Sequence, residues 1–154
     1  MRALRINHVS VHALDLEESV HFYEELFGME RVPTPRFQED VVWLRLGDQQ
    51  LHVFLRMDAT PPFLHHFALD VDDFEGVYRR AKERGLLDGE AFHQALRSHP
   101  QGWVQMYLRD PAGNLVEVDW PDLSVLAPDI RAECGRLDDE VEQTGEARAA
   151  SLYR

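Results

Sequence analysis

Four residues that could bind a divalent metal ion occur on one face of four predicted strands: His8, His52, His66 and Glu117. Successive side chains of a strand point to opposite faces, so residues two apart share a face. In each of these strands the other face carries aliphatic or β-branched residues, which suits packing beneath helices. A single histidine in a strand is more often a hydrogen-bonded core or surface residue. The agreement of four strands therefore carries the prediction of a metal site.

Two adjacent histidines in the stretch "LHHFALDV", residues 64–71, cannot both face such a site. His66 shares its parity with Ala68, whereas His65 shares its parity with Phe67 and Leu69. We therefore predict that His66 is the ligand and that His65 lies on the packed side of the sheet or at an edge.

Two neutral imidazoles and one carboxylate are the ligand set of the facial triad of non-haem Fe(II). Here they would be His8, His66 and Glu117. Three coordination positions of an octahedral ion then stay open. A substrate can chelate through two oxygens, and the third position can take dioxygen or water.

The strands that carry these residues belong to a weak internal repeat. The segment "INHVSVHALDLEESV" from Ile6 aligns with "LHHFALDVDDFEGVY" from Leu64, a shift of 58 residues. Each copy predicts an alternating strand, an acidic helix cap and an amphipathic helix. The predicted caps are Asp15 with Glu18 in the first copy and Asp72 with Glu75 in the second.

Extended segments follow each predicted helix, and turn residues separate the later ones, as in "GDQQ" and "DPAGN". The prediction is an α+β fold of two tandem βαβββ modules, about 4–57 and 63–121, which form a half-open mixed β-sheet cleft. Together they make one domain over residues 1–121. Residues 122–154 are acidic and show no strand pattern, so we expect a C-terminal helical extension with a packing or dimer role.

Composition narrows the classes of function. The chain has 154 residues and a net charge of −12, and nothing in it forms a basic stripe, which argues against nucleic acid. No apolar run approaches the roughly 18 residues of a membrane span, and no signal-peptide pattern is present, so no membrane partner and a cytoplasmic location are expected. The single cysteine, Cys134, excludes an intramolecular disulfide and a cysteine-based zinc cluster.

The tandem modules, with His8 and His66 on the leading strands and Glu117 on the last, resemble the vicinal oxygen chelate superfamily over residues 4–121. That superfamily includes glyoxalases, fosfomycin-resistance thiol transferases, methylmalonyl-CoA epimerases, type I extradiol dioxygenases and metal-free bleomycin-binding proteins. Fold alone does not choose among these activities.

The segment "SHPQGWVQMYLRDPAGNLVE", residues 98–117, is similar to the motif of extradiol ring-cleavage dioxygenases. Arg97 departs from that motif, which prefers a small or aliphatic residue there. His52 lies 14 residues before His66, near the place where those dioxygenases carry an acid–base histidine. The motif positions are matched by His99, Met106, Tyr107, Asp110, Pro111, Gly113 and Glu117.

The resemblance implies a non-haem Fe(II)-dependent enzyme that cleaves the ring of a catecholic aromatic substrate with O2. His52 would be the acid–base group, and His99 and Tyr107 would bind substrate oxygens. Larger extradiol enzymes have two such domains, whereas this chain has one. A homodimer is therefore also expected. Strand parity adds an aromatic pocket and an arginine for a substrate carboxylate. The residues predicted for these two roles are Trp43, Phe54, Trp103 and Arg45, with Arg56 as an alternative arginine.

Two other functions stay open at this point. A glyoxalase-like isomerase, lyase or thiol transferase would use Mn(II), Ni(II) or Zn(II), with His52 as a fourth ligand. A lactoylglutathione-type glyoxalase would carry a glutamate near His52, which counts against that form of the alternative. A metal-free binding protein of the bleomycin-resistance type would hold no stoichiometric metal.

Overall fold

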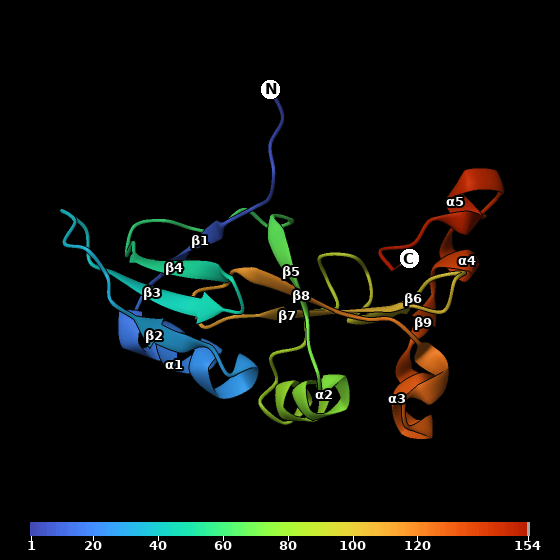
Figure 1. Cartoon of the computed structure of the whole chain (residues 1–154). Helices are drawn as coiled ribbons and strands as arrows, with labels where there is room; N and C mark the ends of the chain where they lie inside the picture. Colours follow the sequence, from blue (N-terminus) through green and yellow to red (C-terminus); the bar gives the residue numbers. More distant parts are fainter. Residues whose placement is uncertain (154) are drawn as a thin grey trace. The chain divides into compact units, whose positions relative to one another are not determined.

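The computed structural model describes residues 1–153 and confirms the α+β class, with two mixed sheets of four and five strands (Figure 1). The chain divides into two compact units. The N-terminal unit consists of Met1–His65 and Asp110–Asn114, and the C-terminal unit consists of His66–Arg109 and the residues from Leu115 onward. Each unit contains one of the two sheets and is described separately.

The N-terminal unit has the predicted βαβββ order. Its sheet has the strand order β1-β4-β3-β2, in which β1 pairs with β4 in parallel and the other pairs are antiparallel. The elements are β1 (His8–Ala13), α1 (Leu16–Phe27), β2 (Glu30–Val32), β3 (Val41–Leu46) and β4 (Gln49–Leu55).

Helix α1 begins at the cap that the sequence predicts. The side chain of Asp15 accepts a hydrogen bond from the backbone N–H of Glu18 at 3.0 Å, which satisfies one of the unpaired donors of the first turn. Gly28 ends the helix with φ 63°, a left-handed conformation that glycine adopts without steric cost. The helix buries Val20, Phe22, Tyr23 and Leu26, and the sheet contributes Leu44, Leu51 and Val53 to the core.

The turn Asp110–Asn114 belongs to the N-terminal unit although it follows a strand of the other sheet. The buried hydroxyl of Tyr23 donates to Oδ2 of Asp110 at 2.8 Å, and Nδ2 of Asn114 donates to the backbone oxygen of His12 at 2.7 Å. The boundaries of the units therefore differ from those of the predicted modules at this turn.

The C-terminal unit repeats the βαβββ order and adds a strand. Its sheet has the order β5-β8-β7-β6-β9, and β5 pairs with β8 in parallel as β1 does with β4. The elements are β5 (His66–Asp70), α2 (Phe74–Glu83), β6 (Leu96–Ser98), β7 (Val104–Arg109), β8 (Leu115–Trp120) and β9 (Gly135–Arg136).

The cap of α2 corrects a sequence prediction. Asp73, rather than Asp72, flanks the helix, and its side chain accepts from the backbone N–H of Gly76 at 2.8 Å. The helix begins one residue later than a cap at Asp72 requires. The neighbouring Asp73, with φ −135° and ψ 75°, is the residue whose side chain reaches the free N–H of the first turn.

The C-terminal segment contains the expected helices: η1 (Leu123–Val125), α3 (Pro128–Glu133), α4 (Leu137–Glu140) and α5 (Gly145–Ala149). It also supplies β9, which the sequence pattern did not predict and which pairs with β6. The final residue of the predicted extension, 154, lies outside the described residues.

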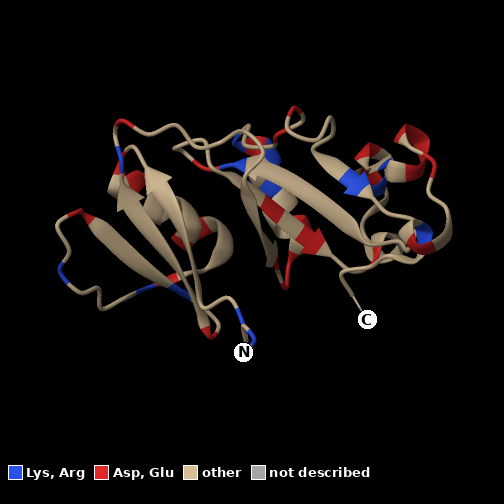
Figure 2. Cartoon of the chain, turned by 90° about the horizontal axis from the view of Figure 1, so that it is seen from above, with Lys and Arg blue, Asp and Glu red and all other residues tan. Residues whose placement is uncertain are grey.

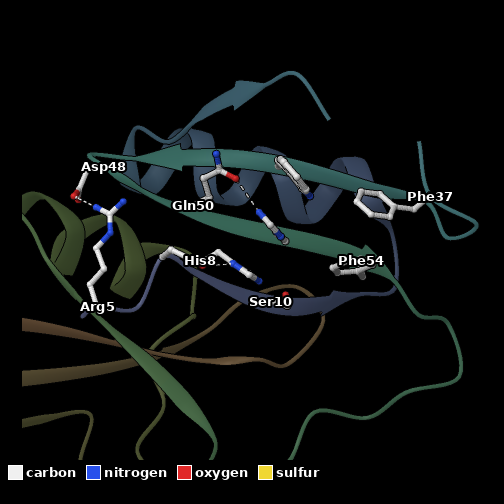
Figure 3. Close-up of a pocket in the computed structure, with 10 residues that line it drawn as sticks. Arg5, His8, Ser10, Phe37, Asp48, Gln50 and Phe54 are labelled. Carbon is white, nitrogen blue, oxygen red and sulfur yellow. Dashed lines mark hydrogen bonds and ion pairs between the residues drawn. The ribbon is translucent and has the colours of Figure 1, made fainter. Parts of the chain in front are cut away.

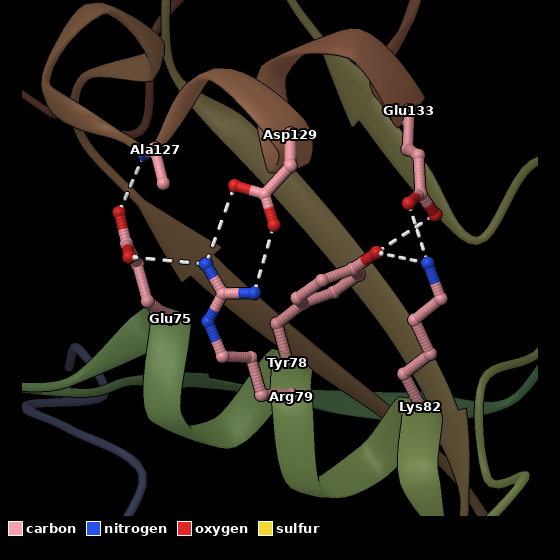
Figure 4. A network of polar contacts seen from close by, with 7 residues as sticks. All are labelled: Glu75, Tyr78, Arg79, Lys82, Ala127, Asp129 and Glu133. Atoms are coloured by element: carbon pink, nitrogen blue, oxygen red, sulfur yellow. Dashed lines mark hydrogen bonds and ion pairs between the residues drawn. The ribbon is translucent and has the colours of Figure 1, made fainter.

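Polar contacts hold α3 on α2 (Figure 4). Arg79 pairs with Asp129 at 2.8 Å, and the hydroxyl of Tyr78 donates to Glu133 at 2.7 Å. Exposed ion pairs of this kind each contribute at most about 1 kcal/mol. These contacts show that α3 packs against α2 within the C-terminal unit.

Acidic residues outnumber basic ones, 28 to 16, and occur on helices and strands of both units (Figure 2). Within residues 1–153, every helix is too short or too polar to cross a bilayer.

Candidate metal centre

The N-terminal unit contains a cavity of about 540 Å³ on the sheet face that carries His8 and His52 (Figure 3). Strands β1, β3 and β4 contribute side chains to it, and Phe37 comes from the segment before β3. Its lining includes His8, Phe37, Trp43, Gln50, His52 and Phe54.

Three rings form a continuous stack in this cavity. The His52 ring lies 4.3 Å from His8 at an interplanar angle of 14°, and 4.2 Å from Trp43 at 3°. Nε2 of His52 is 2.9 Å from Oε1 of Gln50. Because an amide oxygen only accepts, His52 donates through Nε2 and carries its lone pair on Nδ1. Burial, followed by the nearby His8, lowers the pKa of His52, so the ring is neutral at pH 7.

The exposed His8 side chain is oriented by its neighbour. Its Nδ1 lies 2.5 Å from Oδ1 of Asn7, which can only accept a hydrogen bond. Donation through Nδ1 leaves the lone pair on Nε2. This is the state in which a histidine binds a metal, with its other nitrogen held by an acceptor.

The strand register places corresponding residues of the repeat at equivalent positions in the two sheets. Ser10 pairs with His52 between β1 and β4, and Ala68 pairs with Glu117 between β5 and β8. Ser10 and Ala68 each follow the leading histidine of their unit by two residues. His52 therefore occupies the position in the N-terminal unit that Glu117 occupies in the C-terminal unit.

The C-terminal unit brings two predicted ligands together. Nε2 of His66 lies 3.2 Å from Oε2 of Glu117, and the Glu117 residue is only 4% exposed. Nε2 of Gln105 donates to Oε1 of the same carboxylate at 2.6 Å. An imidazole and a carboxylate side by side suit the divalent ions of the first transition row, so these residues fit such a metal.

Within residues 1–153, three or more His, Cys, Asp or Glu side chains nowhere gather closely enough to hold a metal. His8 belongs to the other unit, so its joining the His66–Glu117 pair stays a prediction.

Two further acidic groups surround Glu117. Burial raises the pKa of Asp119 to about 8, and the carboxylates of Glu117 and Asp70 add to this effect. Burial and Glu117 also raise the pKa of Tyr107, which is 2% exposed. The Tyr107 hydroxyl therefore keeps its proton at pH 7. Phe92 packs against this ring at 4.7 Å and against His66 at 5.4 Å.

His99 and Trp103 form a second stack, with ring centroids 3.5 Å apart and an interplanar angle of 7°. Nε2 of His99 lies 2.7 Å from Oε1 of Gln105. The predicted contact of His99 with substrate stays a prediction, as does that of Trp103. In this structure the ε nitrogen of His99 is engaged by an amide.

The predicted substrate arginines have carboxylate partners within their own unit. Arg45 is exposed and pairs with Glu30, and Arg56 lies 3.5 Å from Glu39. Their role toward a substrate stays a prediction.

Sequence reasoning did not assign a role to Gln50 or Gln105. Each shares the parity of the predicted site residues on its strand, which was the available signal. Glutamine, however, is not a characteristic metal ligand, and its partners depend on register.

The fold consists of two repeated βαβββ units, and each unit carries a histidine on its leading strand. Residues 5–118 match the Glyoxalase/Bleomycin resistance protein/Dioxygenase superfamily. The chain belongs to this family, so the predicted superfamily is confirmed.

Curated relatives and solved structures agree with this assignment. The chain is 26% identical to the mitochondrial methylmalonyl-CoA epimerase of Mus musculus, with 75% of this chain and 72% of the relative covered. It is 31% identical to the uncharacterized protein PA2024 of Pseudomonas aeruginosa, with 75% and 87% covered.

Among solved structures, a lactoylglutathione lyase from Agrobacterium tumefaciens is 27% identical with a TM-score of 0.58, covering 77% of this chain and 95% of that one. The oxidase ChaP-H2 is 25% identical with a TM-score of 0.62, covering 77% and 94%.

Proposed function

We propose that this chain is a divalent-metal enzyme that cleaves a catecholic ring with O2, as an Fe(II)-dependent extradiol dioxygenase. The observation that carries the proposal is the aromatic cavity of the N-terminal unit, which holds His8 and His52 beside Trp43 and Phe54. Its volume of about 540 Å³ falls in the range of small-molecule sites. Flat apolar walls with a few polar groups suit an aromatic ring that carries hydroxyls.

The proposed metal ligands are His8, His66 and Glu117. The buried Glu117 carboxylate beside the His66 imidazole supports this set, as does the lone pair that His8 keeps on Nε2. A bound ion would supply positive charge that favours deprotonation of catechol hydroxyls and a position at which O2 can react.

His52 is the proposed general base. It is neutral at pH 7, and its bond to Gln50 leaves the lone pair on Nδ1, so it can take a proton from a substrate hydroxyl. Tyr107 keeps its proton and hydrogen-bonds to Glu117, and its proposed role is to turn that hydroxyl to a substrate oxygen. Phe92 contacts the His66 ring edge to face, with ring centroids 5.4 Å apart.

A second candidate is a glyoxalase-like isomerase, lyase or thiol transferase that uses Mn(II), Ni(II) or Zn(II). The likeness to a methylmalonyl-CoA epimerase at 26% identity and to a lactoylglutathione lyase structure at 27% favours it. So does the repeat-equivalent position of His52 and Glu117, which would make His52 a fourth ligand.

An activity screen of the metal-loaded full chain separates the two. The protein is loaded anaerobically with Fe(II) and exposed to air with several substituted catechols, while O2 uptake and the yellow ring-opened product are followed. Parallel samples with Mn(II), Ni(II) or Zn(II) are given the hemithioacetal of glutathione and methylmalonyl-CoA.

Ring opening with the Fe(II)-loaded protein supports the proposal. Stoichiometric iron without O2 uptake on any catechol would refute it. Elemental analysis that finds no bound metal after loading would instead indicate a metal-free binding protein. Light scattering tests the homodimer that we also propose.

A further inference from the structure

A chain of hydrogen bonds leads away from the Glu117 carboxylate within the C-terminal unit. Gln105 lies on β7, where Tyr107, two residues further along, pairs with Glu117 on β8. The amide of Gln105 donates to Oε1 of Glu117 at 2.6 Å and faces Nε2 of His99 at 2.7 Å. The Gln105 amide therefore connects Glu117, a proposed metal ligand, to His99, which is not a proposed ligand.

The direction of every bond in this chain follows from chemistry. The NH2 group of Gln105 faces Glu117, because its Nε2 is the donor to Oε1 of that carboxylate. The amide oxygen then faces His99, and an oxygen acceptor requires a hydrogen on Nε2 of that imidazole. Because burial lowers the pKa of His99, the ring is neutral at pH 7 and carries its single hydrogen on Nε2.

The His99 end of this series of hydrogen bonds is held in place. His99 lies in the turn between β6 and β7, where its backbone N–H donates to the carbonyl of Trp103 at 2.9 Å and its carbonyl accepts from Gly102 at 2.8 Å. Its ring is stacked on the buried indole of Trp103. A ring held by both backbone and stacking is a rigid anchor for the amide that it contacts.

We infer that Gln105 and His99 are positioning residues that aim the Glu117 carboxylate at the metal, with His99 acting through Gln105 and not on substrate. The inference rests on the proposed function, since it assumes that Glu117 binds a metal. Groups that orient a ligand in this way typically contribute 10- to 100-fold in metal affinity. Gln105 donates to Oε1, while Oε2 lies 3.2 Å from His66, and the side chains of Tyr107 and Asp119 also hydrogen-bond to this carboxylate.

The test is Mn(II) affinity of the full chain, measured from the electron paramagnetic resonance signal of free Mn(II). Gln105→Met keeps the length of the side chain but removes both hydrogen bonds, and we expect its Kd to rise about 10-fold or more. Gln101→Met is the matched control. Gln101 lies in the turn between β6 and β7, is exposed and donates only to the carbonyl of Arg148 among the contacts of residues 1–153, so an unchanged Kd is expected.

His99→Phe provides an independent variant, because phenylalanine can keep the stack on Trp103 while losing the bond to Gln105. Its Kd should rise in the same direction by a smaller factor, since Gln105 keeps its own bond to Glu117. If Gln105→Met fails to give the circular dichroism spectrum of the wild type, this variant carries the affinity test. Unchanged Mn(II) affinity in the folded variants would overturn the inference.

Nitrogen-15 spectra of the metal-free protein separate this inference from the proposed function. We expect His99 to carry its hydrogen on Nε2 in the wild type and to lose that preference in Gln105→Met. If the wild type binds no Mn(II), the proposed function fails. The His99 tautomer then still shows whether the hydrogen bonds from Glu117 through Gln105 to His99 exist as described. A hydrogen on Nδ1 of His99 in the wild type would overturn the chain itself.

Discussion

Replacing Tyr23 by phenylalanine removes a single hydroxyl from the core of the N-terminal unit. Tyr23 is 0% exposed, and its hydroxyl donates to Oδ2 of Asp110, which is 4% exposed. Hydrogen bonds to charged groups contribute about 1.5–3 kcal/mol to stability. Asp110 keeps bonds from Asn114 and from the backbone N–H of Ala112, so the carboxylate stays partly satisfied. We therefore expect Tyr23→Phe to lower the free energy of unfolding by about 2 kcal/mol at pH 7.

The loss should depend on pH in a definite direction. Burial raises the pKa of Asp110 above its unfolded value of about 3.9, while bonds from Asn114 and Tyr23 work against that rise. A raised carboxyl pKa means that stability falls as the pH rises through that pKa. Without the Tyr23 hydroxyl the pKa rises further, so the variant loses more stability than the wild type. The difference between them should be largest above the pKa of Asp110 and smaller at pH 4.

Urea denaturation at both pH values measures this difference, provided that the m-values agree. Tyr153→Phe is the matched control, because its hydroxyl also donates to a carboxylate, at 2.7 Å, but Asp70 is exposed. A loss of no more than about 1 kcal/mol is expected there. If Tyr23→Phe were as stable as the wild type at pH 7, or lost more at pH 4 than at pH 7, the reasoning would be wrong.

Three further outcomes are expected. His52→Gln should lower catechol turnover about 10²- to 10⁴-fold, because a general base is lost, while Mn(II) affinity changes little. The control His21→Gln, at an exposed histidine, should change neither turnover nor affinity. Loss of Mn(II) binding in His52→Gln would favour the isomerase alternative. Although burial opposes it, the backbone N–H of Ala91 and the Arg109 guanidinium lower the pKa of Asp88, so the stability that this carboxylate provides is lost as the pH falls through its folded pKa. Asp88→Asn should cost about 1–3 kcal/mol at pH 7 and less at pH 3, by urea denaturation. Removing metal with a chelator should lower the melting temperature of the loaded wild type to that of the metal-free protein, and an equal melting temperature before and after chelation would count against a bound metal.

The sequence predicted the sheet faces well because strand periodicity is a local property. Val53 and Val118 lie in the core, and His52 and Glu117 lie on the other face of the same strands. The helix packing beneath each sheet imposes this alternation, so a pattern of period two is sufficient to find it. The N-terminal cap at Asp15 was predictable for the same reason, since it depends on a bond across only three residues.

Features that depend on contacts distant in the sequence were not predictable. Strand β9 has two residues and, within residues 1–153, pairs regularly with β6, so no pattern of its own could reveal it. The turn at Asp110 belongs to the N-terminal unit through a hydrogen bond to Tyr23, which is 87 residues away. The role inferred for Gln105 depends on the register of β7 against β8, which strand parity alone does not set.

The residue at position 52 is where this chain departs from a symmetric repeat, and the departure has an electrostatic consequence. The equivalent position in the C-terminal unit is a carboxylate, Glu117, whereas His52 is a neutral imidazole. In the proposed site, one carboxylate and two imidazoles would leave a divalent ion with a net charge of about +1. A glutamate at position 52 that also bound the ion would bring the charge to about zero. In that proposal the remaining positive charge would favour a chelating substrate that binds as an anion, such as a catecholate, because it would stabilise the deprotonated form. His52 also keeps a lone pair on Nδ1 in the aromatic cavity, so an imidazole rather than a carboxylate at this position would both leave the ion its charge and supply the proposed base.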